Sequence, residues 1–292
     1  MSYAIGSEGQ LGVITEATVR ILRAAEGARP MLLGFESPET AGACVSAIIA
    51  AGIIPVAIEY MDKPAIAVCE AFARAGYPLD VEALLIVEVE GSEPEINALL
   101  KKIAEIAKKF NPKTMEISAD SDHSARIWAG RKSAFGAIGR ISDYYCMDGT
   151  IPLGQLSHVL TRISEICAAR DLKVANIFHA GDGNLHPLIL YDANKPGELE
   201  RAEAFGGRIL EACVEVGGTI TGEHGVGVEK INQMCVQFQP KELVLFHALK
   251  KAWDETGLLN PGKAVPTLHR CAEFGAMHVH GGALKFPDIP GF

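Results

Sequence analysis

The sequence contains no long apolar run and no closely spaced cysteine pair. Within its 292 residues no stretch of eighteen consecutive apolar residues occurs, which argues against a membrane-spanning helix. Its first residues lack a charged start followed by an apolar segment, so no secretory signal is expected. The seven cysteines are an odd number, lie far apart and include no Cys-x-x-Cys. That pattern favours buried thiols in a reducing cytosol over a disulfide framework or a cysteine-ligated metal site, so we expect a cytoplasmic protein.

Basic charge is also scarce. The formal net charge is −9 and the pI is about 5.5, which argues against nucleic acid as the main partner. Hydrophobic residues make up 48% of the chain, enough for a substantial core. A chain of this length holds one large domain or two of ordinary size.

From residue 31 onward, segments with strand character alternate with amphipathic segments. Strands are predicted near residues 31–36, 56–61, 83–90, 114–118, 144–151 and 173–178. Helices are predicted near residues 38–51, 64–75, 93–110, 122–140, 154–170, 197–216, 229–238 and 241–256. Residues 13–22 also alternate and predict a strand. This alternation indicates a layered unit of sheet and helices, without deciding between parallel and antiparallel strands.

The segment from His179 to His186 reads His-Ala-Gly-Asp-Gly-Asn-Leu-His. The run from Gly181 to Asn184, which includes Asp182, predicts a hairpin tip, with Asp182 and Asn184 in turn or supporting roles. His179 and His186 flank that tip symmetrically, so we predict a cross-strand pair with Cβ atoms about 5 Å apart. Two imidazoles at that separation can share one metal ion. The alternative interpretation is a turn that two histidines happen to flank.

A second glycine-rich segment, Gly222-Glu223-His224-Gly225-Val226-Gly227, carries an acid and a histidine. An acid and a histidine flanked by glycines are hard to explain by packing in a hydrophobic core. Glu223 would complete a His₂Glu metal site with His179 and His186. His224 would then remain as an acid or base, because histidine titrates near neutral pH.

Arg131 lies three residues after Trp128 on a predicted helix, so both side chains share one side of it. An arginine beside an aromatic ring can bind a substrate carboxylate through two parallel hydrogen bonds. The alternative is a surface arginine that stacks on the tryptophan.

The tail holds four potential soft metal ligands within twelve residues. They are His269, Cys271, His278 and His280. A metal site there and an irregular tail that packs over the body both fit this pattern, and the second is favoured.

Four motifs together resemble a known family. They are Gly-Ser-Glu-Gly-x-Leu-Gly-Val-Ile-Thr, His-x-Gly-Asp-Gly-Asn-Leu-His, Gly-Glu-His-Gly-Val-Gly and Leu-Asn-Pro-Gly-Lys, in this order. The same motifs occur in FAD-linked oxidases of the vanillyl-alcohol oxidase type. The resemblance covers essentially the whole chain, and four ordered motifs are far more specific than any one alone.

The resemblance implies an α+β fold. Residues 1–25 would be the end of the FAD-binding domain, and most of that domain would precede this chain. Residues 26–265 would form the substrate or cap domain, with a large, mostly antiparallel sheet, covering helices and ferredoxin-like elements. Residues 266–292 would be a C-terminal tail.

The resemblance also implies a reaction, the FAD-dependent oxidation of a small 2-hydroxy acid of the glycolate or D-lactate type to the 2-oxo acid. A divalent Zn, Mn or Fe ion on His179, His186 and Glu223 would chelate the substrate. His224 would be the general base, and Arg131 would pair with the substrate carboxylate.

The same resemblance assigns the residues around the flavin and the substrate. Flavin contacts would come from Gly6, Ser7, Gly9, Gly12, Ile14 and Asn260. Phe135, Cys146 and Leu188 stand where relatives that use diacids place polar groups, which favours a monocarboxylate.

Other oxidase subunits are expected partners, among them an iron–sulfur subunit. A homodimer and peripheral attachment to a membrane through partner subunits are compatible with this interpretation. Two other functional classes stay open: a flavin-independent metallohydrolase with a zinc-bound water, and a non-catalytic interaction domain.

Overall fold

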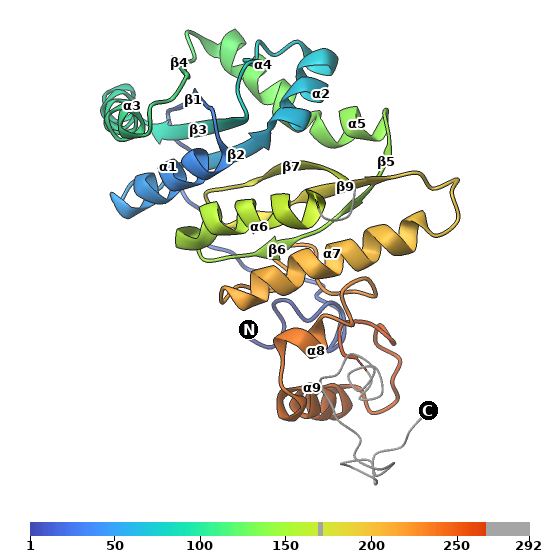
Figure 1. Ribbon diagram of the computed structural model, residues 1–292. Helices are drawn as coiled ribbons and strands as arrows, with labels where there is room; N and C mark the ends of the chain where they lie inside the picture. Colours follow the sequence, from blue (N-terminus) through green and yellow to red (C-terminus); the bar gives the residue numbers. More distant parts are fainter. Residues whose placement is uncertain (169–171, 267–292) are drawn as a thin grey trace. The chain divides into compact units, whose positions relative to one another are not determined.

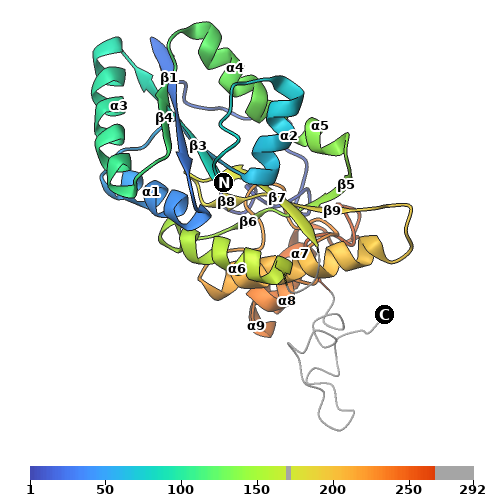
Figure 2. The same cartoon turned by 45° about the horizontal axis from the view of Figure 1, so that its top comes forward.

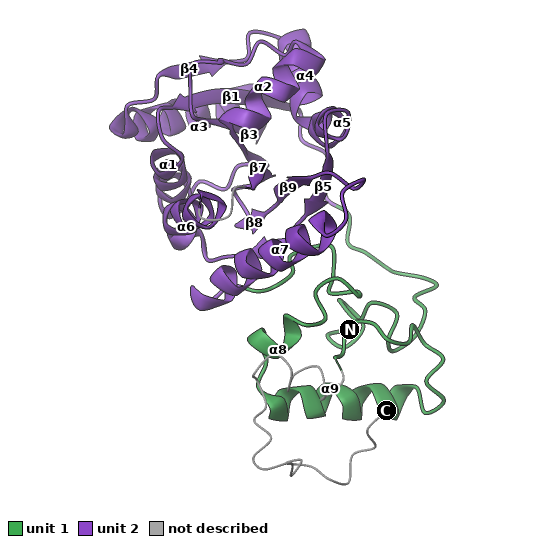
Figure 3. Ribbon diagram, turned by 45° about the vertical axis from the view of Figure 1, so that its right-hand side comes forward, with its two compact units in different colours: residues 1–21, 219–292 green, residues 22–218 purple. Residues whose placement is uncertain are grey.

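The computed structural model describes residues 1–168 and 172–266, and it divides into two compact units (Figure 3). Unit 1 joins residues 1–21 to the segment that begins at Thr219, and unit 2 comprises Leu22–Gly218. The domain boundaries predicted after residues 25 and 265 stay predictions. The tail histidines and Cys271 lie outside the described residues.

Unit 2 is built on an antiparallel sheet. Its described residues form strands β1 (Gly27–Phe35), β2 (Ala57–Asp62), β3 (Ala83–Gly91), β4 (Thr114–Ile117), β5 (Asp143–Cys146), β6 (Gly149–Thr150), β7 (Lys173–His179), β8 (Asn184–Leu185) and β9 (Pro187–Tyr191). They run in the order β4-β1-β3-β2-β7-β8-β6, while β9 pairs with both β7 and β5. Every pairing described is antiparallel, which confirms the predicted large antiparallel sheet.

Helices cover the sheet of unit 2 (Figure 1). They are α1 (Pro38–Ala50), α2 (Lys63–Ala73), α3 (Glu93–Ala107), α4 (Ser121–Lys132), α5 (Ala134–Gly139), α6 (Leu156–Ala168) and α7 (Glu198–Glu215). Figure 2 shows α2, α4 and α5 on one side of strands β1–β3, with α1 and α3 on the other. The segment predicted as one helix over 122–140 is divided at Ser133, whose hydroxyl donates to the Gly130 carbonyl.

The core beneath α2, α4 and α5 is apolar. It gathers Leu32, Met61, Leu84, Ile86, Ile177 and Leu188 from the sheet, each 0–1% exposed. Burial of such side chains stabilises the fold by about 1.5–3 kcal/mol each relative to exposure. Polar residues on and beside the strands of this core form the candidate site.

A buried carboxylate fixes α2 against β7. Asp62 accepts hydrogen bonds from the Ala65 backbone N–H, in the first turn of α2, and from both nitrogens of Asn176. Burial raises the pKa of Asp62 to about 6, while these donors oppose the rise. Helix α2 therefore begins at a defined point on the sheet.

The strand predicted over residues 13–22 does not form. Residues 11–26 have no regular secondary structure, and Val13, Val19 and Ile21 are 74–87% exposed. Alternation makes a segment suitable for a sheet, but a strand also needs a neighbour to pair its backbone groups.

Unit 1 is mostly loop, with two helices among its described residues, α8 (Met234–Gln237) and α9 (Pro240–Trp253). The helix predicted over 229–238 is reduced to the single turn of α8. Throughout the described part of the chain, we find no helix with the length and hydropathy to cross a membrane.

Candidate functional site

The hairpin of the first motif has a different register from the one predicted. His179 lies opposite Asn184, so the tip is Ala180–Gly183. Gly183 has a φ of +70°, and a Cβ there would meet the Ile151 carbonyl oxygen at 2.3 Å, so this turn requires glycine. The direct pairing of His179 with His186 is therefore wrong. The two rings nevertheless meet edge to face, with centroids 5.5 Å apart.

A buried acid holds His179 in place. Glu59, on β2 directly opposite His179, places Oε1 2.8 Å from the histidine Nδ1. The glutamate side chain is only 7% exposed and the histidine 36%. A ring that bonds through Nδ1 can ligate a metal only through Nε2, so the carboxylate selects the nitrogen that could serve as ligand.

Arg131 contacts the same acid. Its Nε and Nη2 lie 3.0 and 2.8 Å from Glu59 Oε2, and the arginine is 7% exposed. The alternative of a surface arginine stacked on Trp128 is wrong, because it is Lys132 that lies over that ring, at 5.9 Å. The predicted carboxylate clamp therefore already has an anionic partner within the protein.

The approach of α4 to the sheet depends on Gly130. A Cβ at this position would come within 2.5 Å of the Tyr77 hydroxyl, which itself donates to the Ile127 carbonyl. Glycine lets the helix pack against Tyr77. This contact places the next residue, Arg131, within reach of Glu59.

His186 is held in a comparable way. It is 2% exposed, and its Nδ1 lies 3.2 Å from the Met147 backbone carbonyl. Metal-ligating histidines usually donate one ring nitrogen to a carboxylate or a backbone carbonyl in this manner. His179 and His186 thus form a pair of nitrogen ligands of the kind that Zn, Mn and Fe accept.

An apolar wall borders the same core. Cys146 lies opposite Leu188 on paired strands, and Leu188 is fully buried. Phe135 and Tyr144 pack against this cluster, with ring centroids 6.1 Å apart. The three positions predicted to be apolar, Phe135, Cys146 and Leu188, are thus brought together.

In unit 1, the loop with Glu223 and His224 is fixed from the N-terminal segment. Glu8 accepts hydrogen bonds from the backbone N–H groups of Val226 and Gly227, each 2.7 Å long. His224 Nε2 lies 3.6 Å from Glu223 Oε1, and both side chains are about half exposed. The acid and the histidine of the second motif therefore sit on an anchored loop.

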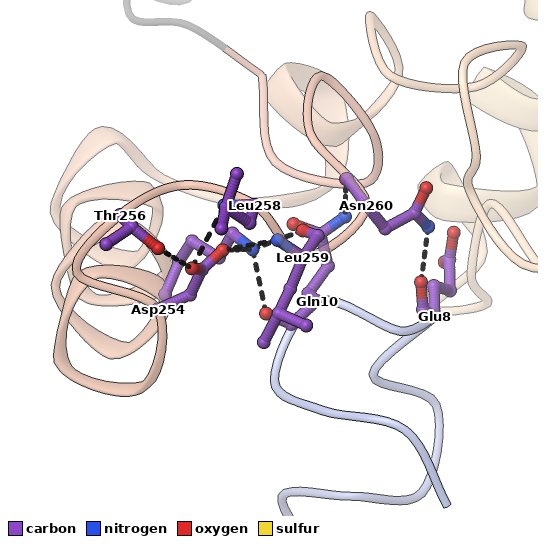
Figure 4. Close-up of polar contacts among 8 residues, drawn as sticks. Glu8, Gln10, Asp254, Thr256, Leu258, Leu259 and Asn260 are labelled. Atoms are coloured by element: carbon purple, nitrogen blue, oxygen red, sulfur yellow. Dashed lines mark hydrogen bonds and ion pairs between the residues drawn. The ribbon is translucent and has the colours of Figure 1, made fainter.

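A polar network joins the N-terminal segment to the Leu-Asn-Pro-Gly motif (Figure 4). Asn260 donates to the Glu8 carbonyl and accepts from Lys263, while Gln10 donates to the Asn260 carbonyl. Lys250 donates to the Gln10 carbonyl, to Asp254 and to the Leu259 carbonyl. All of these partners belong to unit 1.

The residues predicted to contact flavin also lie in unit 1. Gly6 and Gly9 both have a φ of +74°, and no atom lies within 4 Å of a Cβ built on Gly6. An open glycine backbone fits the close approach of a cofactor. Asn260 uses both ends of its amide on protein partners, so its described role is to hold the segment in place.

Sequence reasoning missed two acids. Glu59 interrupts a strand that otherwise reads as buried, and an acid within such a strand is the signal that could have identified it. Glu8 was seen only as part of a glycine-rich segment. Its contacts join residues more than two hundred positions apart, which no local pattern reveals.

Comparison with known proteins supports the family resemblance. Residues 25–264 match the family model of the C-terminal domain of FAD linked oxidases. The chain is 56% identical over 288 residues to the glycolate oxidase subunit GlcD of Escherichia coli (strain K12), covering 98% of this chain and 58% of that protein. It is 28% identical over 264 residues to a probable mitochondrial D-lactate dehydrogenase of Danio rerio, covering 89% of this chain and 53% of that protein. This chain thus spans little more than half the length of these relatives.

Solved structures share the fold. A p-cresol methylhydroxylase with substrate bound superposes with a TM-score of 0.61 at 16% identity, covering 84% of this chain and 54% of that one. A 4-ethylphenol oxidase from Gulosibacter chungangensis gives a TM-score of 0.64 at 14% identity, with coverages of 85% and 55%. From its motifs, its sheet and the extent of the family match, the chain belongs to the FAD-linked oxidase C-terminal domain family.

Proposed function

We propose that the protein carrying this chain oxidises a small 2-hydroxy acid, of the glycolate or D-lactate type, to the 2-oxo acid. The observation that carries the proposal is the group formed by Glu59, Arg131 and His179 beside His186 in unit 2. It supplies two oriented imidazoles and a guanidinium whose Nη1 is not among the nitrogens that contact Glu59. The relatives named above, a glycolate oxidase subunit and a D-lactate dehydrogenase, are named for substrates of this class.

His179 and His186 would hold a divalent cation together with Glu223. A bound Zn, Mn or Fe ion would supply Lewis acidity that lowers the pKa of the substrate hydroxyl. FAD, when bound, supplies the two-electron acceptor, with the segment of Gly6, Ser7, Gly9, Gly12 and Ile14, together with Asn260, as its proposed contacts in this chain.

The chain's own residues would orient the substrate and move one proton. Arg131 would donate a hydrogen bond from Nη1 to the substrate carboxylate, which would fix the orientation of the acid. His224 would accept the proton of the hydroxyl oxygen on a ring nitrogen. The carbon that bears this hydroxyl would lose its hydrogen as a hydride, for which FAD would be the acceptor, and the product is the 2-oxo acid. Glu8 keeps the loop of His224 in place through the two backbone hydrogen bonds described above.

The apolar wall of Phe135, Cys146 and Leu188 would exclude a second carboxylate. An ion buried against such side chains without a partner is strongly disfavoured. Glycolate and D-lactate carry no second charge and would fit.

Steady-state turnover of the native protein with a dye acceptor tests this proposal. We expect kcat/KM for glycolate or D-lactate to exceed that for 2-hydroxyglutarate by at least about tenfold, since one unpaired buried polar group costs on the order of 1–3 kcal/mol. A preference for 2-hydroxyglutarate would contradict the proposed substrate class.

Metal removal gives a separate prediction. Dialysis against a chelator should lower kcat/KM, and a stoichiometric amount of Zn²⁺ or Mn²⁺ should restore it, because the substrate would bind through the cation. Full activity in protein shown by elemental analysis to lack transition metals would remove the cation from the proposal.

The name of the glycolate oxidase relative, which is a subunit, supports the existence of partner subunits. We propose that the protein works with other oxidase subunits, including an iron–sulfur subunit. We further propose that it is cytoplasmic, that it forms homodimers and that its partner subunits attach it peripherally to a membrane.

A further inference from the structure

Glu59 is an acid in a row of buried apolar positions. Strand pairing places Leu32 opposite Ile86, Ile86 opposite Glu59, and Glu59 opposite His179. Leu32 and Ile86 are 1% and 0% exposed, and Glu59 is 6% exposed. A carboxylate in such a row costs free energy unless its charge is paired and its oxygens are hydrogen-bonded.

Both oxygens of Glu59 have partners on different elements. Oε1 lies 2.8 Å from His179 Nδ1 on β7, and Oε2 lies 2.8 and 3.0 Å from Arg131 Nη2 and Nε on α4. One buried side chain thus fixes the imidazole of one strand and the guanidinium of one helix. A rotation of Glu59 would disturb both contacts together.

From this geometry we infer that Glu59 is a positioning residue that couples the metal-binding histidine to the carboxylate-binding arginine. The inference rests on the proposed function. The carboxylate fixes the His179 tautomer with its proton on Nδ1, which makes Nε2 the ligand nitrogen. It also offsets the charge of Arg131, so that the guanidinium keeps one orientation inside the protein.

Metal affinity of the full chain tests this role directly. We would titrate Zn²⁺, in competition with a chromophoric chelator, into the wild type, Glu59→Gln and the matched control Glu88→Gln. Glu88 is also a strand carboxylate that contacts α4, where it accepts a hydrogen bond from Trp128 Nε1 at 2.7 Å. We expect Glu59→Gln to bind Zn²⁺ about 10- to 100-fold more weakly, as is usual when the support of a ligand histidine is removed. Glu88→Gln should retain the wild-type affinity.

A second variant separates positioning from folding. Glu59→Gln leaves Arg131 buried without an anion and could unfold the unit, whereas the double variant Glu59→Leu with Arg131→Met replaces the whole ion pair by apolar groups. We expect this double variant to melt close to the wild type and still to bind Zn²⁺ weakly. Long-range ¹H–¹⁵N spectra of the metal-depleted wild type should show His179 protonated at Nδ1, and those of the double variant should show a mixture of tautomers.

The outcomes separate the inference from the function on which it rests. A wild type that binds no Zn²⁺ would contradict the proposed metal centre itself. A wild type that binds Zn²⁺, with folded Glu59 variants that bind it equally well and keep the Nδ1 tautomer, would overturn the role of Glu59.

Discussion

In unit 2, hydrogen-bond acceptors of the protein itself orient the two histidines that are proposed to bind a metal. His179 is held by Glu59 and His186 by the Met147 carbonyl, so both rings are fixed before any ligand arrives. Such orientation lowers the entropy lost on binding and favours one coordination geometry.

Replacing His224 tests the proposed base. His224→Gln should lower kcat by about 10²- to 10⁴-fold, the usual contribution of a general base, with a smaller change in KM. Steady-state kinetics measure both constants. His158→Gln, on the exposed side of α6, is the control and should behave as the wild type. A variant with unchanged kcat would exclude His224 as the base.

Replacing Arg131 tests the internal ion pair. Arg131→Met leaves the Glu59 carboxylate buried without its cation, which should destabilise the protein by about 3–5 kcal/mol. Urea denaturation measures the loss. Arg126→Met, on the same helix and solvent-exposed, should cost little. Equal stability of the two variants would show that the pair has no such energetic role.

At the level of elements, glycines and acids set the shape of the site loops. Gly225 has a φ of +84°, and a Cβ there would lie 2.9 Å from the Glu8 carboxyl carbon. The loop of the second motif is thus shaped by its own backbone and by a residue from the opposite end of the chain.

Gly225→Ala should therefore weaken this loop. The left-handed conformation costs about 1–2 kcal/mol for alanine, and the contact with Glu8 adds to it. Thermal unfolding should show a lower Tm for this variant. Its kcat should also fall, because the neighbouring residue is His224, the proposed base. The control is Gly257→Ala, because Gly257 has a φ of +69° and open space around a Cβ. The stability lost by this control measures the cost of the left-handed backbone alone. If both alanine variants lose the same stability, the Glu8 contact is unimportant.

The Lys250–Asp254 pair makes unit 1 sensitive to acid. The hydrogen bond from Lys250 holds the pKa of Asp254 at about 2, below the ordinary 3.8, against the opposing effect of burial. A lowered pKa stabilises the folded state above about pH 4, and this contribution is lost as the pH falls through 2. Asp254→Asn should thus lower the Tm at neutral pH, with a difference from the wild type that shrinks between pH 4 and 2. If the difference in Tm between Asp254→Asn and the wild type does not change between pH 4 and 2, this assignment is contradicted. The control is Glu255→Gln, at the neighbouring exposed residue.

At the scale of the whole molecule, the sequence predicted the type and order of most elements in unit 2. Apolar periodicity and the caps at Ser37 and Ser92 are local, so they can be read without a structure. Strand partners are not local: the strand expected over residues 13–22 found none, and the hairpin register was off by two residues. The site residues were named from motifs, but Glu59 and Glu8 were missed because their roles come from contacts between distant segments.

Anaerobic reduction of the flavin tests the central claim most directly. The native protein, mixed with glycolate or D-lactate without an acceptor, should lose its oxidised flavin absorbance in a single turnover, and the chelator-treated protein should lose it more slowly. An oxidised flavin that stays unchanged with every 2-hydroxy acid tested would contradict the account.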